Sequence, residues 1–295
     1  MLQTLRQLPW LLRRTLVASI DDGLFAVAKG AAYSGLLSLF PVLTSAAAIS
    51  VQMRADYVRQ KLAVFLSRIL PPGTEDAVLQ QFRYQGQRPV ALIVVAAILS
   101  LWAASSVIKS LMDGFNAAYR VPRTRSMGAH IGVGIMLVFL IVIPMLGASS
   151  LVLFGGTVEH AVMRALKVDP VLNPLTGSWE FLSRAMRYIT AFGAAWSLTA
   201  ILFYFGPYRK QQWRHVLPGA FLATVLWLLA TLGFSWYVRH ITNYNVLYGS
   251  IGTGIALLIW MYLLAIIALF GCEFNAECDR MRSAELRLSE PKHPA

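Results

Sequence analysis

The chain has 295 residues, of which 57% are apolar and 14% are charged, and its formal net charge is +12. This composition is too apolar for a soluble domain of that length and is typical of a polytopic membrane protein. We therefore interpret the basic surplus as lysine and arginine that hold loops against anionic lipid, not as a nucleic-acid surface.

Residues 1–23 predict an amphipathic helix that lies in the membrane surface on the cytoplasmic side. Leucines recur there at helical spacing and arginines interrupt them: Leu5, Leu8, Leu12 and Leu16, with Arg6, Arg13 and Arg14. A secretory signal would need an uninterrupted apolar core followed by a small-residue cleavage site. Asp21 and Asp22 follow instead.

Six apolar runs predict helices that cross the hydrocarbon core. They are 24–49, 90–108, 131–154, 188–205, 216–238 and 250–271. Together they form a transmembrane domain over 24–274, followed by a cytoplasmic tail over 275–295. The segment 51–88 is polar with an apolar helical face, which predicts helices on the extracytoplasmic side. The predicted class is all-α: a membrane bundle of six transmembrane helices with amphipathic interfacial helices.

The short loops favour an orientation with both termini in the cytoplasm. Residues 207–215 carry three lysines or arginines in nine positions, whereas residues 239–249 carry one in eleven. Basic residues concentrate in cytoplasmic loops, and an even number of crossings places both termini on the same side. The six basic residues in 51–88 argue against this orientation, although a helical segment of that size can be translocated despite its charge.

Four ionisable residues fall near the cytoplasmic third of the membrane in this topology: Lys29, Asp113, Glu273 and Glu277. We hypothesise that they meet as a charge network, because ionisable groups at that depth are costly unless they are paired. Such a network could be a gate, a site for a polar headgroup or solute, or a static latch between helices. Alternatively, Lys29 extends its ammonium to the membrane surface, and Lys109 pairs with Asp113 within one helix.

Polar and small side chains near these charges are candidates to line a path through the bundle. They are Tyr33, Ser38, Asn116, Asn243, Tyr244, Tyr248 and Ser250. The stretch 243–252, NYNVLYGSIG, is either a partly unwound segment that lines a cavity or a tight turn whose glycines let helices approach.

No sequence pattern indicates catalysis, a metal or a cofactor. The histidines are scattered (His130, His160, His215, His240 and His293), and neither HExxH nor GxxxxGK occurs. Cys272 and Cys278 lie six residues apart on one element, which fits neither a disulfide framework nor a zinc site. We predict that the chain is not an enzyme and has no cofactor and no nucleic-acid partner.

Several runs resemble the YihY/BrkB family of bacterial inner-membrane proteins. They are AAYSGLLSLFP at 31–41, LPPG at 70–73, WAASSVIKSLMDGFNAAYRV at 102–121, LPGAFLATVLW at 217–227 and NYNVLYGSIG…LIWMYL…GCEFNAE within 243–277. The resemblance covers roughly residues 20–280. It implies six crossings, an inner-membrane location and a role in envelope integrity or virulence.

The family has also carried the label ribonuclease BN. A hydrolase that acts on RNA needs a metal cluster or an acid/base pair in a cleft beside a basic groove, and the sequence has no such pattern.

We expect a transporter or permease that moves a small solute or a lipid through a polar cavity, surrounded by membrane lipids. The alternative is a non-transporting scaffold for envelope integrity, in which the same charges hold helices together.

Overall fold

The computed structural model describes residues 2–52, 90–122, 126, 128–144, 176–241 and 249–289, and within these ranges the chain is helical apart from short links. The helices are α1 (Leu2–Asp21), α2 (Leu24–Gln52), α5 (Val90–Ala118), a shorter helix (Gly128–Pro144), α7 (Thr176–Phe205), α8 (Trp213–Ile241) and α10 (Gly249–Ser289). The predicted all-α class is confirmed for this part of the chain.

Within the described ranges, five helices are long and apolar enough to cross a membrane. They are α2, α5, α7, α8 and α10, and they contain the first, second, fourth, fifth and sixth predicted runs. For the third run, 131–154, only the part up to Pro144 is described, and most of the segment 51–88 lies outside the described residues. A polytopic helical membrane protein is confirmed, and the count of six crossings stays a prediction.

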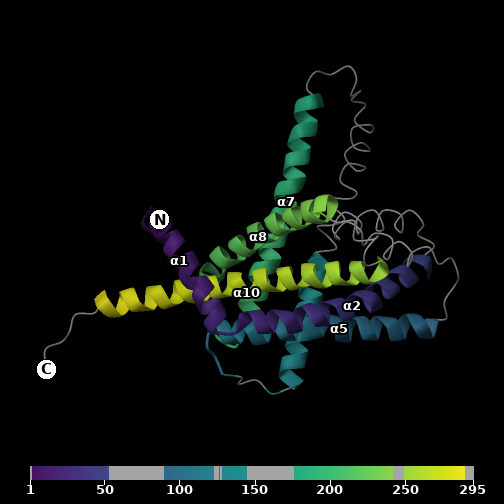
Figure 1. Cartoon of the computed structure of the whole chain (residues 1–295), viewed down its shortest axis with the longest axis horizontal. Coiled ribbons are helices and arrows are strands. Elements are labelled where there is room, and N and C mark those ends of the chain that lie inside the picture. The colour runs from purple at the N-terminus through teal and green to yellow at the C-terminus, as the bar shows by residue number, and fades with distance from the viewer. Residues whose placement is uncertain are drawn as a thin grey trace.

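The long helices pack around α10. In Figure 1, α2 and α5 run alongside each other in opposite directions, and α10 lies against both of them and against α8. Helix α1 crosses α10 near its C-terminal part, and α7 packs on α8 while running steeply across the others. With 41 residues, α10 is roughly 60 Å long at about 1.5 Å per residue, so it is about twice as long as the hydrocarbon core is thick.

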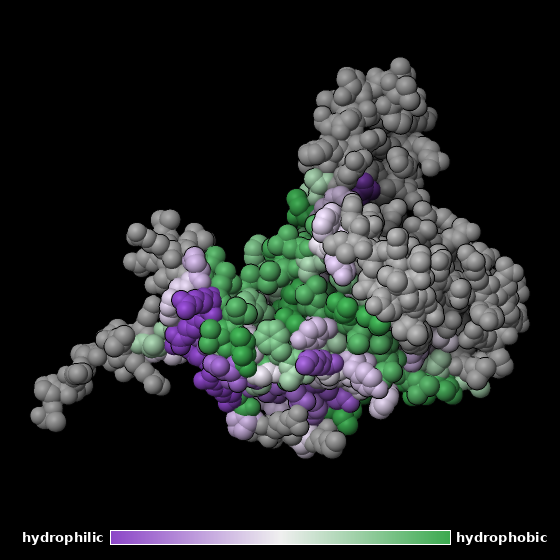
Figure 2. All heavy atoms as spheres, viewed as in Figure 1, coloured by the Kyte–Doolittle hydropathy of each residue, from purple (hydrophilic) through white to green (hydrophobic). Residues whose placement is uncertain are grey.

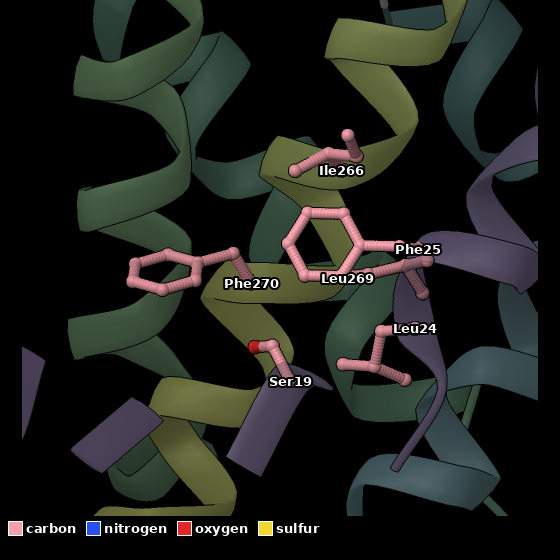
Figure 3. Close-up of a pocket in the computed structure, with 6 residues that line it drawn as sticks. All are labelled: Ser19, Leu24, Phe25, Ile266, Leu269 and Phe270. Atoms are coloured by element: carbon pink, nitrogen blue, oxygen red, sulfur yellow. The ribbon is translucent and has the colours of Figure 1, made fainter. Parts of the chain in front are cut away.

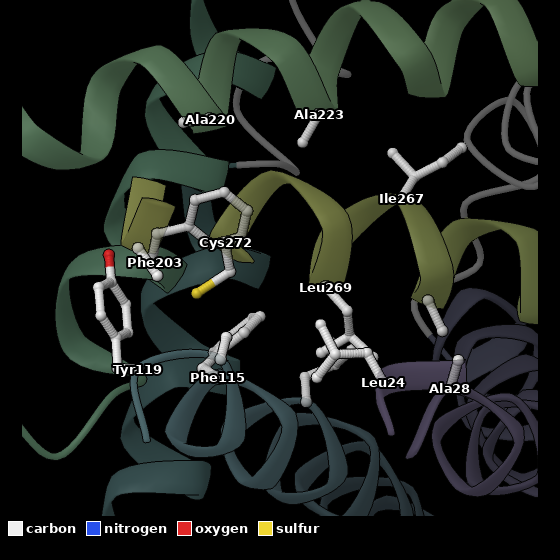
Figure 4. Close-up of a cluster of buried hydrophobic side chains, with 14 of the residues drawn as sticks. Leu24, Ala28, Phe115, Tyr119, Phe203, Ala220, Ala223, Ile267, Leu269 and Cys272 are labelled. Carbon is white, nitrogen blue, oxygen red and sulfur yellow. The ribbon is translucent and has the colours of Figure 1, made fainter. Parts of the chain in front are cut away.

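The core lies where α10 meets the surrounding helices. Buried residues of α2, α5, α7, α8 and α10 form one apolar cluster, part of which Figure 4 shows. Leu269 of α10 occupies the space beside Gly114 of α5, where any side chain would collide with it. Phe115 and Phe203 meet edge to face with ring centroids 5.4 Å apart, a favourable aromatic geometry. This part of the interior is apolar and closely packed.

Helix α1 presents two different faces. Leu11, Thr15 and Ala18 are buried on the side that packs against the bundle. Leu8 and Leu16, two of the leucines in the predicted amphipathic pattern, remain exposed on its outer surface. Figure 3 shows the corner between α1, α2 and α10, where a hollow of about 10 Å³ is left. That space holds about one water molecule.

Two residues with left-handed backbone end helices at the same end of the bundle. Gly23 (φ 69°) reverses the chain between α1 and α2. Arg120 (φ 53°) follows α5, where its N–H bonds the Ala117 carbonyl and the next N–H bonds the Asn116 carbonyl. This is the Schellman arrangement, in which glycine is the usual residue. An arginine there costs about 1 kcal/mol or more in backbone strain.

Helices α8 and α10 approach each other closely at two glycines. A Cβ on Gly219 would overlap the Gly271 carbonyl oxygen and lie 2.5 Å from Asn275 Cγ. A Cβ on Gly271 would lie 2.7 Å from Ala223 Cβ. Small residues let helix backbones approach in membranes, so this contact explains why both glycines are needed.

We predict that Gly219→Ala destabilises the protein by roughly 1–3 kcal/mol, because the added methyl group overpacks the contact with α10. Gly233→Ala on the same helix is the matched control, since a Cβ there meets no atom within 4 Å. The control should be neutral or slightly stabilising, by up to about 1 kcal/mol. Thermal unfolding in detergent micelles measures both, and equal effects of the two substitutions would contradict the close approach.

Candidate functional site

The polar residues of the last turns of α10 meet three other segments at one end of the bundle. These segments are the link between α1 and α2, the end of α5, and the link 206–212 between α7 and α8. We call this region the charged end. Figure 2 shows hydrophilic residues gathered where α1 crosses α10, beside a broad hydrophobic surface.

Glu273 and Arg280 form the centre of the charged end. The Glu273 side chain is 0% exposed, and its Oε1 accepts a hydrogen bond of 2.9 Å from Arg280 Nη1. The same nitrogen also bonds Glu277, one turn before Arg280. Arg280 Nη2 donates to the carbonyl of Ala118, which is the last residue of α5. One guanidinium therefore pairs two buried carboxylates and satisfies a helix-end carbonyl that has no partner within its own helix.

Further ion pairs extend this centre to α1 and to the end of α5. Arg14 Nε lies 2.6 Å from Glu277 Oε2. Arg120 Nε lies 3.2 Å from Asp22 Oδ1, whose carboxylate is also 3.8 Å from Arg280 Nη2. The Arg280 network, as we call it, consists of Arg14, Asp22, Arg120, Glu273, Glu277 and Arg280. Its carboxylates and guanidiniums are equal in number, so its formal charges cancel.

Two buried amides fasten backbone segments to the charged end. Asn275 accepts a 2.7 Å hydrogen bond from the Gly219 N–H and donates a 3.0 Å bond to the Val216 carbonyl. It thereby ties α10 to the first turns of α8, next to Pro218, which lacks an N–H. Asn116 Oδ1 accepts a 2.8 Å bond from the Tyr208 N–H. Asn116 was predicted to line a cavity, and the structure shows it holding the link 206–212 against α5.

Asp279 pairs with basic side chains of the link 206–212 and of the start of α8. Its carboxylate lies 3.0 Å from Arg209 Nη2 and 3.0 Å from His215 Nδ1. The Arg209 guanidinium also lies over the Tyr119 ring, 4.5 Å from its centroid, in cation–π geometry. Burial raises the pKa of Tyr119 well above its ordinary value, so its hydroxyl stays protonated.

Asp113 takes part in a separate group beside the Arg280 network. Its Oδ1 lies 3.9 Å from His130 Nε2, and the other ring nitrogen of His130 contacts the Tyr208 hydroxyl. The group joins α5, the helix 128–144 and the link 206–212. The structure thus gives Asp113 a histidine neighbour that the sequence pattern did not indicate.

The structure brings Glu273 and Glu277 together but does not bring Lys29 to them. Ala28, Ala31 and Ala32 are the buried face of this part of α2, whereas Lys29 lies on the exposed face. Within the described part of the chain, no carboxylate lies within 4.0 Å of the Lys29 ammonium. Its position fits the alternative in which the ammonium reaches the membrane surface. Arg280 holds the central place that the charge-network hypothesis gave to Lys29.

Of the other predicted path-lining residues, the structure describes the side chains of Tyr33 and Ser38. Tyr33 is 61% exposed, on the same face as Lys29, and Ser38 bonds the Gly35 carbonyl within α2. Asn243, Tyr244 and Tyr248 lie outside the described residues, and Ser250 is described only as part of α10. Their role as path-lining residues stays a prediction.

The sequence analysis missed the arginines that neutralise the carboxylates. One signal was present, because Arg280 follows Glu277 by three positions and Glu273 by seven, which places all three on one helix face. The contributions of Arg14, Asp22 and Arg120 depend on how distant segments pack, and no local spacing indicates them. Among the described residues, no group of three or more His, Cys, Asp or Glu could hold a metal ion.

These observations define a polytopic α-helical membrane protein whose buried charges are paired at one end of the bundle. The chain belongs to the family described as virulence factor BrkB, whose model matches residues 16–295. The resemblance to the YihY/BrkB family is therefore confirmed.

The chain is also similar to individual membrane proteins. It is 28% identical over 249 residues to the ribonuclease-like protein YfkH of Bacillus subtilis (strain 168), covering 83% of this chain and 86% of that protein. It is 26% identical over 275 residues to a UPF0761 membrane protein of Tolumonas auensis, covering 92% and 87%. For the UPF0761 membrane protein Mpe_A1422 of Methylibium petroleiphilum, the identity is 25% over 278 residues, 93% of this chain but 64% of that protein. No solved structure matches the chain.

We predict that Arg280→Met destabilises the protein by about 3–5 kcal/mol, because it leaves the buried Glu273 carboxylate without its partner. Adding Glu273→Gln should restore most of that loss, since Glu277 keeps Arg14 and Asp22 keeps Arg120. Unfolding in detergent measures both variants. Arg282→Met is the control, because this side chain is 49% exposed and only 4.0 Å from Asp279, and it should change stability by less than about 1 kcal/mol. An Arg280→Met protein as stable as the control would contradict the central role of Arg280.

Proposed function

We propose that the chain is a membrane transport protein of the permease type, which moves a small solute or a lipid, and that the Arg280 network is its gate. The observation that carries this proposal is the burial of Glu273 within a membrane-spanning helix, among ion pairs and a hydrogen bond that join α1, α5 and α10. Ionisable residues at such positions are expensive and commonly mark transport pathways. In this interpretation, the structure is a closed state.

The energetics of buried charges support a gate over a latch. A buried ion pair can often be replaced by apolar side chains of similar volume with no loss, or with a gain, in stability. If the charges served only to hold helices together, apolar packing would do so as well. Paired charges differ from apolar packing, because water can hydrate each charged side chain when the helices that carry them separate. The network can therefore have two accessible states.

We further propose that the protein lies in the bacterial inner membrane with the charged end and both termini in the cytoplasm. The basic link 206–212 and the start of α1 support this orientation, since basic residues favour the cytoplasmic side. Membrane lipids are the proposed partners, and we propose neither an enzymatic activity nor a nucleic-acid partner.

The alternative function is a non-transporting scaffold for envelope integrity. Two observations favour it: Lys29 and Tyr33 lie on the exposed face of α2, and the described core between the helices is apolar. In a scaffold, the Arg280 network would be a permanent clamp, and its charges would never be exposed to water.

The double variant Glu273→Gln with Arg280→Met tests gate against clamp, with Cys272 as a probe. Cys272 is fully buried on α10, one residue before Glu273, and a Cys278→Ser background leaves it as the only cysteine. Thiol reagents modify the thiolate, which forms only where water reaches. If the network is a gate that opens, methanethiosulfonate ethylammonium should reach and modify Cys272 while the protein stays folded. The double variant, which lacks the central Glu273–Arg280 pair, should react at least tenfold more slowly at a melting temperature close to that of the parent.

Equal labelling rates in the parent and the double variant, both no faster than global unfolding, would establish a clamp and remove the gate. Flux is measured in parallel in proteoliposomes, with dithionite reduction of fluorescent NBD-phosphatidylglycerol for lipids and light scattering after a glycerol gradient for small neutral solutes. Transport predicts flux of a probe in the parent and a loss of that flux in the double variant. Absence of both gating and flux would leave the scaffold as the function.

A further inference from the structure

A cavity of about 350 Å³ opens beside the Arg280 network. Its lining residues come from the end of α5, the link 206–212 and the last turns of α10: Tyr119, Arg209, Ala276, Asp279, Arg280, Ser283 and Ala284. Pockets that bind small molecules have volumes of roughly 300–1,000 Å³. The cavity is therefore large enough for a small polar ligand, in contrast to the hollow between α1 and α10.

The Tyr119 hydroxyl is a buried polar group, in a residue that lines the cavity, that could bind a ligand. Tyr119 is 9% exposed, and within the described part of the chain its hydroxyl oxygen has no hydrogen-bond partner. Leaving a buried polar group without a partner costs roughly 1–3 kcal/mol. Burial keeps the phenol protonated, so the hydroxyl is an unused donor in the residue that lines the cavity. Its oxygen is itself buried, so the ring or the wall has to shift before an acceptor in the cavity can reach it.

Arg209 adds charged donors directly above the same ring. Among the described residues, its guanidinium donates one hydrogen bond, from Nη2 to Asp279 Oδ2 at 3.0 Å. A guanidinium has five N–H donors, so most of them remain for a ligand. Arg209 and Tyr119 thus place a charged and a neutral donor in adjacent residues of the wall, with the guanidinium 4.5 Å from the centre of the ring.

The charge balance of the cavity favours an anion. The Arg280 network is formally neutral, so the remaining carboxylate in the wall is that of Asp279. Opposite it stand Arg209 in the wall and Arg282 at 4.0 Å, which leaves a positive surplus among these described groups. A positive cavity with preformed donors concentrates anions.

We propose that this cavity binds a phosphate-bearing anion, through Arg209 and the Tyr119 hydroxyl. A phosphate group has several acceptor oxygens in the geometry that a guanidinium fork matches, and one of them would satisfy the phenol. The phosphate belongs either to the headgroup of a membrane lipid or to a soluble phosphate compound. The cavity lies beyond the charge-free part of α10, which ends at residue 272, so both sources can reach it. The site does not depend on the proposed transport.

Binding is tested with the full-length chain purified in dodecylmaltoside, by following its thermal unfolding while ligand is added. Inorganic phosphate is titrated against chloride at matched ionic strength, and dioleoylphosphatidylglycerol is compared with oleate, an anionic lipid without phosphate. A ligand that binds only the folded state raises the unfolding temperature in a concentration-dependent way. A rise with inorganic phosphate identifies a soluble source, and a rise with phosphatidylglycerol alone identifies a lipid.

Three variants distinguish binding at this specific cavity from non-specific attraction of anions to the basic surface. Arg209→Gln and Tyr119→Phe should each weaken the apparent affinity at least tenfold. Lys210→Gln removes the same charge from an exposed neighbouring position and should change the affinity less than twofold. Tyr119→Phe should fold normally without ligand, because the hydroxyl that it loses has no partner among the described residues. The proposal is overturned if neither phosphate probe raises the unfolding temperature, if oleate acts as strongly as phosphatidylglycerol, if Lys210→Gln weakens binding as much as Arg209→Gln, or if Tyr119→Phe leaves the affinity unchanged.

Discussion

The pairing of Glu273 with Arg280 is the constraint on which the charged end depends. Glu273 has no exposed surface, and an unpaired carboxylate in that position would cost several kcal/mol. Arg280 must therefore stay within hydrogen-bonding distance, and it also holds the last carbonyl of α5. One guanidinium consequently fixes the position of α5 relative to α10. Two further members of the network, Asp22 and Arg14, then fix the position of α1.

The contact between Gly219 and Gly271 places this pairing at one end of the bundle. The two backbones approach closely there, and Asn275 locks the approach by bonding α8 one turn further along α10. The side of the contact toward residue 249 is apolar core, whereas the carboxylates of α10 all lie on the other side. The carboxylates of α10 therefore lie at one end of the apolar core, where Cys272 and Ala276 still belong to that core. For a permease this is the expected position of a gate, and for a scaffold it is the expected position of a surface clamp.

The fold class and two of the central residues could be predicted from sequence, because they depend on local patterns. Long charge-free runs indicate membrane helices, and the spacing of Glu273 and Glu277 places them on one face. The role of Lys29 could not be predicted in this way, since a run that is apolar all round does not indicate which face packs. Ala28, Ala31 and Ala32 form the buried face of this part of α2. Lys29 therefore lies on the opposite, exposed face. Arg280 lies one helical turn beyond Glu277, and its contacts with Ala118 and Asp22 depend on how distant segments pack.

Arg280 lines the proposed anion site and is also the centre of the proposed gate, so the two are physically linked. A phosphate bound beside Arg280 would compete with Glu273 and Glu277 for the same guanidinium. By reciprocity, any change in the network that frees Arg280 strengthens anion binding, and bound anion favours that change by an equal free energy. Asp279 competes with a bound anion for Arg209, because its carboxylate already pairs with that guanidinium. In the proposed site, the charge of Asp279 against the surrounding arginines would therefore limit how tightly an anion binds beside the network.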